Sequence, residues 1–309
     1  MISIPTVSVG IPTCNRAKTL KKAIRSVLDQ SFRDFELSVL DNSSTDDTPE
    51  VVKSFDDARI RYVRNEENLG MMLNFNQCLK SFRGRYCAFL GSDDYWLPGF
   101  LESMVEVLDK NPSVGIAFTN HYFLRNDKLE PRKRLVRPGT HKECAAMVLT
   151  VNPICLAAAL IKKDVFNEIG EFRPHVFNGD FDLYLRVARA GYGMYYVDQL
   201  LSVYRLHEEN ESKDWLKTGE SMVTILSDIR FPSSKNERLR RKKLSLFYRR
   251  LGMAISQRHS QDALIKARSE FKKSLQTWPV SISAWAGYLT TYLPKAIHPL
   301  IISIGKLKG

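Results

Sequence analysis

Several features that mark common protein classes are missing from this 309-residue chain. No apolar run approaches the roughly 18 residues that a membrane-spanning helix needs. The opening stretch, MISIPTVSVGIPTCN, lacks the basic start and cleavage pattern of a signal peptide, so we expect a cytoplasmic protein. The cysteines show no C-x-x-C spacing, which favours reduced thiols over a disulfide framework or a zinc site: Cys14, Cys78, Cys87, Cys144 and Cys155.

Acidic residues are scarce in the last quarter of the chain. Residues 1–230 contain 30 Lys+Arg and 31 Asp+Glu, a net charge of −1, whereas residues 231–309 contain 16 and 3, a net charge of +13. The two sums give the formal net charge of +12 for the whole chain. This asymmetry predicts two parts, a large domain over 1–230 and a basic, amphipathic helical extension over 231–309.

Strand-like and helix-like stretches alternate through the first 122 residues. TVSVGIPT and FELSVLD are rich in β-formers, and KTLKKAIRSVLDQ between them carries apolar residues at helical spacing. Repetition of this kind predicts an α/β fold, a mostly parallel sheet with helices on both faces. Residues 125–153 are polar and irregular, which predicts a loop excursion from that sheet.

Glycine is absent from the turn after the first strand, PTCNRAKTL. A nicotinamide-dinucleotide domain needs G-x-G-x-x-G at that turn so that the backbone can approach the pyrophosphate, and this class is therefore disfavoured. Asp41 ends the second strand, at the sheet edge where open parallel sheets bind ligands, and suits a ribose hydroxyl or a base. Taken alone, Asp41 is equally consistent with a turn or helix-capping residue.

Two adjacent carboxylates follow the fourth strand in YCAFLGSDDYW. Asp93 and Asp94 repel each other when ionised unless a positive group lies between them. Carboxylate oxygens are hard ligands that suit Mg²⁺ or Mn²⁺, which complete their shell with phosphate oxygens. A helix N-cap is the alternative interpretation of these two residues.

These stretches together resemble the family-two glycosyltransferases, which are inverting enzymes of the GT-A fold that use nucleotide sugars. The resemblance covers roughly residues 5–212 and rests on VSVGIPTCNRAKTL, SVLDNSSTDDT, NLG and GRYCAFLGSDDYWLPGFLE. It implies that the nucleoside is held by Asp41 and the first turn: Pro12, Thr13 and Asn15. It also implies that Asp93 and Asp94 form the metal-binding aspartate motif for Mn²⁺ or Mg²⁺, with Asp93 on the donor side.

The resemblance also implies a catalytic base. FNGDFDLYLRVARAG is similar to the Glu-Asp motif of the family and places Asp180 in the aspartate position, where an inverting enzyme needs a carboxylate to deprotonate the acceptor. VYRLHEENES is similar to the segment that closes over the diphosphate, which makes Arg205 and His207 donor-binding candidates and His207 a further metal-ligand candidate. The chain departs from the family at Gly91 and Gly179, where acids are usual.

We therefore predict a metal-dependent, non-processive, inverting glycosyltransferase of the cell-surface polysaccharide type. It would move one sugar from a nucleotide sugar, with UDP as the expected nucleotide, to a hydroxyl of a glycan or lipid-linked acceptor. The processive synthases of the family carry a Gln-x-x-Arg-Trp motif, which this chain lacks. The alternatives are a non-catalytic nucleotide- or glycan-binding relative and a sugar nucleotidyltransferase.

The basic extension favours an anionic surface as its partner. Each Lys or Arg near an anionic membrane contributes about 1 kcal/mol, so residues 231–309 would attach the protein peripherally to the inner face of the membrane. Packing of a solvated basic helix on the catalytic domain is the alternative. No nucleic-acid recognition motif accompanies the charge, so we expect no nucleic-acid partner.

Overall fold

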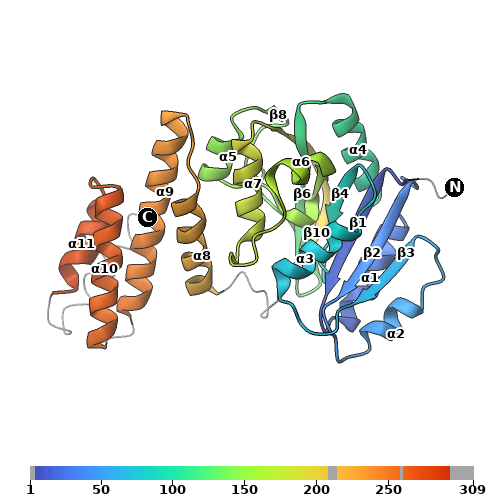
Figure 1. Cartoon of the computed structure of the whole chain (residues 1–309), viewed down its shortest axis with the longest axis horizontal. Helices are drawn as coiled ribbons and strands as arrows, with labels where there is room; N and C mark the ends of the chain where they lie inside the picture. Colours follow the sequence, from blue (N-terminus) through green and yellow to red (C-terminus); the bar gives the residue numbers. More distant parts are fainter. Residues whose placement is uncertain (1–3, 208–213, 258–259, 293–309) are drawn as a thin grey trace. The chain divides into compact units, whose positions relative to one another are not determined.

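The computed structural model describes residues 4–207, 214–257 and 260–292. They form two compact units, one built from residues 4–175 and 179–207 and the other from residues 176–178 and 214–292. Figure 1 labels the elements of both units.

The first unit is built on one mixed sheet, in which four neighbouring strands are parallel. β1 pairs with β2 and β4, and β2 pairs with β3. The parallel strands are β1 (Val7–Thr13), β2 (Phe35–Asp41), β3 (Ile60–Arg64) and β4 (Tyr86–Phe89). The sheet continues in the order β3-β2-β1-β4-β9-β6-β10-β5. The α/β class expected from the alternating sequence is therefore confirmed.

The remaining strands extend this sheet beyond β4. β9 (Ala159–Lys162) runs antiparallel between β4 and β6 (Val114–Arg125). β10 (Gly193–Arg205) is parallel to β6 and antiparallel to the two-residue β5 (Tyr95–Trp96). The short β5 was not expected from the sequence.

Helices cover both faces of the sheet. Alternate residues of β1, such as Val7 and Val9, share a buried cluster with α1 (Ala17–Leu28) and α4 (Phe100–Lys110). The other face packs on α3 (Met71–Ser81), where a Cβ on Gly10 would approach Cys78 Cβ to 2.9 Å. The smaller helices are α2 (Thr48–Lys53), α6 (Lys163–Ile169) and α7 (Gly179–Arg189).

Most of the polar stretch 125–153 is ordered into edge elements. β7 (Lys128–Pro131) forms a hairpin with β6, and β8 (Gly139–His141) pairs with β10. α5 (Cys144–Thr150) follows, and a single 3₁₀ turn, η1 (Leu156–Ala158), leads into β9. β7 is exposed along its whole length, and no periodic apolar pattern marks it as a strand in the sequence.

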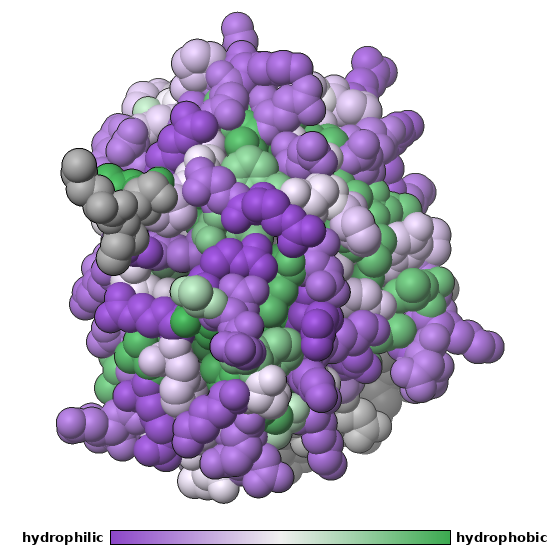
Figure 2. Space-filling model, turned by 90° about the vertical axis from the view of Figure 1, so that its right-hand side faces the viewer, coloured by the Kyte–Doolittle hydropathy of each residue, from purple (hydrophilic) through white to green (hydrophobic). Residues whose placement is uncertain are grey.

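Hydrophilic side chains dominate the surface on the side where β2, β3 and α2 are drawn. Figure 2 shows this face as mainly hydrophilic, with hydrophobic side chains in narrow patches between polar ones. The edge strand β3 agrees with this pattern, because Arg61 and Arg64 are exposed and none of its side chains is fully buried.

The second unit consists of helices, drawn in orange and red in Figure 1. They are α8 (Trp215–Asp228), α9 (Ser234–Ser256), α10 (Gln261–Thr277) and α11 (Ile282–Thr290). α9 and α10 pack closely enough for the Ser245 hydroxyl to lie 2.8 Å from that of Ser274. The predicted division after residue 230 falls between α8 and α9, inside this unit. No helix in the described part of the chain is long and apolar enough to cross a membrane.

Candidate active site

The ends of β1 and β2 meet at the carboxyl edge of the sheet. Thr13 is in register with Asp41, and the Asn42 N–H donates to the Thr13 carbonyl over 2.8 Å. The register brings two segments that are separated by almost thirty residues to the same point. This edge is the usual ligand-binding position in open parallel sheets.

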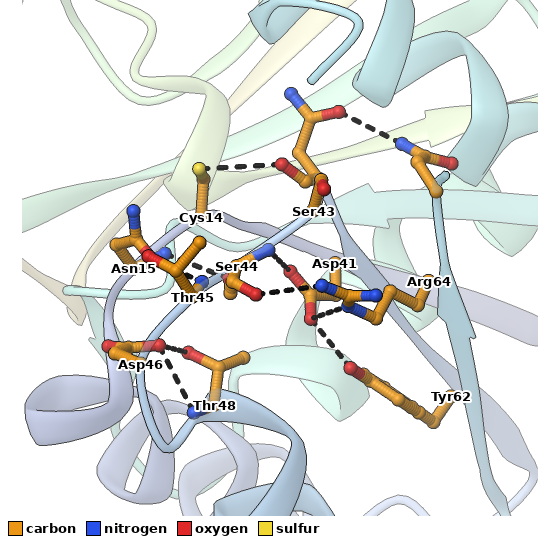
Figure 3. Close-up of polar contacts among 12 residues, drawn as sticks. Cys14, Asn15, Asp41, Ser43, Ser44, Thr45, Asp46, Thr48, Tyr62 and Arg64 are labelled. Carbon is orange, nitrogen blue, oxygen red and sulfur yellow. Dashed lines mark hydrogen bonds and ion pairs between the residues drawn. The ribbon is translucent and has the colours of Figure 1, made fainter. Parts of the chain in front are cut away.

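The carboxylate of Asp41 is fully buried in a polar network (Figure 3). Its Oδ1 accepts the Ser44 N–H at 2.9 Å, and its Oδ2 accepts the Tyr62 hydroxyl at 2.6 Å. Arg64 Nε lies 3.7 Å from Oδ2. Burial and this hydrogen bond raise the pKa of Tyr62. Asp41 therefore holds the loop after β2 in shape, and the predicted contact between Asp41 and a nucleoside stays a prediction.

The first turn is tied to the same loop. Asn15 adopts a left-handed backbone with φ 52°, and its N–H donates to the Ser44 hydroxyl over 2.9 Å. Its Oδ1 accepts the Thr45 N–H at 2.7 Å, as Figure 3 shows. Thr13 is buried, and its hydroxyl has no hydrogen-bond partner among the described residues. Pro12 precedes it and is partly exposed. The four predicted nucleoside contacts are thus clustered in space.

The short strand β5 brings the two carboxylates to the end of β10. Ser202 pairs with Trp96 and Val203 with Tyr95, which places Asp93 and Asp94 beside the residues that follow. The Arg205 N–H donates to Asp94 Oδ1 over 2.8 Å. His207 Nε2 lies 2.7 Å from Asp93 Oδ2. The four residues predicted as a donor and metal site therefore lie in one cluster.

The two aspartates each direct their second carboxylate oxygen to one point. A Cβ built on Gly91 would lie 2.9 Å from Asp93 Oδ1 and 2.8 Å from Asp94 Oδ2. These are the oxygens that His207 and the Arg205 N–H leave unused. The absence of a side chain at Gly91 lets the two like charges approach each other.

This donor set fits a divalent cation. Two converging carboxylate oxygens are the hard ligands that Mn²⁺ and Mg²⁺ take from proteins before phosphate and water complete the shell. No group of three or more metal-binding side chains occurs within the described ranges, so a cation here depends on ligand oxygens as well.

Electrostatics around the pair agree with this arrangement. Asp94 is 5% exposed, and burial together with the Asp93 charge raises its pKa well above the usual range. The Arg205 N–H and charge offset part of that effect. A positive ion between the carboxylates would remove the cause of the repulsion.

Asp180 lies in the first turn of α7 and is partly buried. Its Oδ1 accepts the Phe181 N–H at 2.7 Å, and burial raises its pKa. A carboxyl group with a raised pKa is a stronger base once ionised. Asp182, two residues later, instead pairs with Arg173 and Arg186 and anchors the helix.

Cys155 responds to the charges of both carboxylate sites. Burial, together with the charges of Asp94 and Asp180, raises the pKa of this thiol to about 12. Both charges therefore act on one thiol at the start of η1. A lone cysteine outside any motif gave no sign of this position in the sequence, and the site includes it only through the tertiary fold.

The chain matches known proteins in sequence. The family profile described as Glycosyl transferase family 2 matches residues 8–170, more than half of the chain. The chain belongs to glycosyl transferase family 2. The interpretation of its motifs as those of a family-two glycosyltransferase is thereby confirmed.

Two curated relatives illustrate the similarity. TuaG of Bacillus subtilis, named as a teichuronic acid biosynthesis glycosyltransferase, is 28% identical over 228 residues, 73% of this chain and 88% of TuaG. WfgD of Escherichia coli is named as a UDP-Glc:alpha-D-GlcNAc-diphosphoundecaprenol beta-1,3-glucosyltransferase. It is 27% identical over 228 residues, which cover 72% of this chain and 86% of WfgD.

Solved structures show the same fold. TarS 1-349 of S. aureus in complex with UDP-GlcNAc superimposes with a TM-score of 0.71 at 17% identity, over 93% of this chain and 89% of that one. The mannosyltransferase PcManGT of Pyrobaculum calidifontis, in complex with GDP-Man and Mn²⁺, gives 0.63 at 17% identity, over 97% and 84%. The expected GT-A architecture with C-terminal helices is confirmed.

Proposed function

We propose that this glycosyltransferase moves a single sugar, with inversion, from a UDP-sugar to a hydroxyl of a glycan or lipid-linked acceptor. The observation that carries the proposal is the convergence of Asp93 Oδ1 and Asp94 Oδ2 above Gly91, beside Arg205 and His207. This cluster can hold a cation and a diphosphate at the edge of the sheet that also carries the polar loops after β1 and β2.

The donor would lie across the two polar clusters. Thr13, with its buried hydroxyl lacking a partner among the described residues, and Asn15 would contact the nucleoside. Asp41 would act by shaping the loop, and through it the nucleoside site. The N–H and Nε of Arg205 bind the Asp94 carboxylate and the Asp93 carbonyl, which holds Arg205 beside the proposed cation position. Its positive charge would therefore lie near the diphosphate.

Asp93 and Asp94 would hold Mn²⁺ or Mg²⁺, with His207 orienting Asp93. The cation would supply Lewis-acid stabilisation of the diphosphate leaving group. The His207 contact at 2.7 Å fixes the Asp93 side chain so that Oδ1 faces the cation position. The proposed metal dependence therefore rests on residues that the fold already orients.

Asp180 would act as the base. It would take the proton of the acceptor hydroxyl while that oxygen attacks the anomeric carbon opposite the diphosphate. The new C–O bond forms as the bond to the nucleoside diphosphate breaks, which inverts the configuration. The charges of Asp94 and Asp180 both raise the pKa of Cys155, which agrees with a base placed near the diphosphate site.

The relatives support the donor and the acceptor class. WfgD is named for transfer from UDP-Glc to a diphosphoundecaprenol-linked sugar, and a TarS structure contains UDP-GlcNAc. A lipid-linked acceptor agrees with a peripheral membrane position for this enzyme. PcManGT was solved with GDP-Man and Mn²⁺. GDP-sugars are therefore the alternative donors with which UDP-sugars should be compared.

The second unit would supply the membrane contact through the region of α11, not through the apolar face of α9. The apolar face of α9 is buried in its own unit, with Leu244, Phe247 and Leu251 at most 7% exposed. α11 contains no charged residue, and its region exposes apolar side chains at helical spacing: Ile282 by 84%, Trp285 by 48%, Leu289 by 59% and Tyr292 by 56%. Aromatic residues beside basic ones are typical of membrane interfaces.

A donor-turnover assay tests the enzymatic proposal. UDP release from a panel of UDP-sugars would be measured with Mn²⁺ and a synthetic diphospholipid-linked monosaccharide, and GDP-sugars would serve as the comparison. Asp180→Asn is expected to lower kcat about 10²–10⁴-fold, the usual contribution of a general base. Asp164→Asn is a matched control, since Asp164 lies exposed in the first turn of α6. Equal turnover in both variants would remove Asp180 from the mechanism.

A further inference from the structure

Tyr184 carries a buried polar group that packing does not explain. Its side chain is fully buried in α7, and its hydroxyl has no hydrogen-bond partner among the described residues. A buried hydroxyl without a partner destabilises a fold, and native proteins contain few of them. Phenylalanine would fill the same space without that penalty, so the hydroxyl points to a role outside stability.

The position of Tyr184 on its helix links it to the candidate base. Asp180 precedes it by four residues, so the two side chains lie on the same face of α7. Long helical side chains lean toward the N-terminus, which directs the Tyr184 ring over the turn that contains Asp180. Burial, followed by the Asp180 charge, raises the pKa of the Tyr184 phenol, as this placement requires.

We propose that Tyr184 is a positioning residue whose hydroxyl donates a hydrogen bond to Asp180 Oδ2 when the acceptor binds. The inference rests on the proposed role of Asp180 as the base. Oδ1 already accepts the Phe181 N–H at 2.7 Å, so Oδ2 is the oxygen that remains. Hydrogen bonds of catalytic groups are often long in free enzymes and tighten in the complex.

The hydrogen bond would fix the rotation of the carboxylate and stabilise its ionised form. One lone pair of Oδ2 would then bind Tyr184, and the other would remain for the acceptor proton. A carboxylate that turns freely about its last bond would hold the correct alignment for a smaller fraction of the time.

Within the part of the chain that the structure describes, few other titratable groups act on this pair. Cys155 is the second neighbour that acts on Tyr184, and Asp94 acts on Cys155 in turn. α5, which packs on α7, contributes no charged residue. The charged residues of α6 bind other groups. Lys163 donates to the Phe82 carbonyl, Asp164 accepts from Asn167, and Glu168 accepts from the Tyr192 hydroxyl.

Tyr184→Phe tests the inference through the pH profile of kcat. The loss of the donor should lower kcat about tenfold at the optimum and leave the KM for the donor sugar unchanged. It should also move the acid limb of the profile up by about half to one pH unit, because the ionised base loses a hydrogen bond. The melting temperature should stay the same or rise, since a hydroxyl without a partner is removed.

Tyr86→Phe is the matched control. Tyr86 is 4% exposed and begins β4, at the end away from Asp93 and Asp94. Unlike the Tyr184 hydroxyl, its hydroxyl has a partner and donates to Asp109. This variant should melt at a lower temperature with an unchanged kcat profile, the reverse of Tyr184→Phe. A Tyr184→Phe enzyme with wild-type kcat and an unmoved acid limb would overturn the inference.

Comparison with Asp180→Asn separates this inference from the proposed function. If Asp180→Asn is inactive and Tyr184→Phe adds no further loss in the double variant, the two residues act as one unit. If Asp180→Asn is inactive but Tyr184→Phe behaves as wild type, only the positioning role fails. If Asp180→Asn itself retains full turnover, the assignment of the base fails first.

Discussion

Met72 occupies the space that a side chain on Gly179 would fill. A Cβ built on Gly179 would overlap Met72 Sδ, and Met72 is only 8% exposed at the start of α3. The family commonly has an acid at the position of Gly179, so this chain replaces it with a close contact between α3 and α7. The departure is therefore a packing arrangement that fixes the helix carrying Asp180.

Gly179→Glu should destabilise the protein by about 1–3 kcal/mol, because the new side chain overpacks against Met72. Met72→Ala should cost about 2–5 kcal/mol alone, since it leaves a cavity. The free energy of unfolding lost in the double variant should be smaller than the sum of the two single losses by about 1 kcal/mol or more. Urea denaturation of the four proteins measures this coupling, and strict additivity would show that the two residues do not share the space.

The pH dependence of stability should expose the burial of Asp180. Burial raises its folded-state pKa above the ordinary value of 3.8. The protonated form is therefore favoured in the folded protein, and its stabilising contribution is complete below 3.8 and is lost as the pH rises through the folded pKa. Asp180→Asn should melt above wild type at pH 8 and match it near pH 4. A variant that melts below wild type at pH 8 would contradict this.

Most of the first unit was predictable because its strands and helices are local patterns. The runs around β1, β2 and β4 are buried and apolar, and the helices between them carry apolar residues at regular spacing. The adjacent Asp93 and Asp94 and the end of β2 were likewise visible as strand-end acids. β1 is parallel to both β2 and β4, so the ends of these strands lie at the same edge of the sheet.

The missed features depend on contacts between distant segments. β5 has only two residues and exists because it pairs with β10, more than a hundred residues later. The effect of the Asp94 and Asp180 charges on Cys155 has the same origin and leaves no motif in the sequence. In the second unit, amphipathic spacing in α9 was visible, but whether that face meets a membrane or α10 was not.

The exposed apolar residues of the α11 region should mediate membrane binding. Wild-type protein should sediment with vesicles that contain phosphatidylglycerol and much less with pure phosphatidylcholine, and salt should weaken the binding. Trp285→Ser with Leu289→Ser should reduce sedimentation, whereas Ala286→Ser, an exposed change on the same helix, should not. Unchanged sedimentation of the double variant would contradict a membrane role.

Thermal unfolding of wild type and Asp94→Asn with UDP, with and without Mn²⁺, shows directly whether Asp93 and Asp94 hold a cation. At about 100 times the dissociation constant, a ligand stabilises by about 2.7 kcal/mol, or roughly 5–10 °C for a domain of this size. We predict that UDP shifts the wild type only when Mn²⁺ is present and that Asp94→Asn shows no shift, although it folds as stably as wild type. A shift that is independent of Mn²⁺, or one that survives in Asp94→Asn, would contradict a cation held between Asp93 and Asp94.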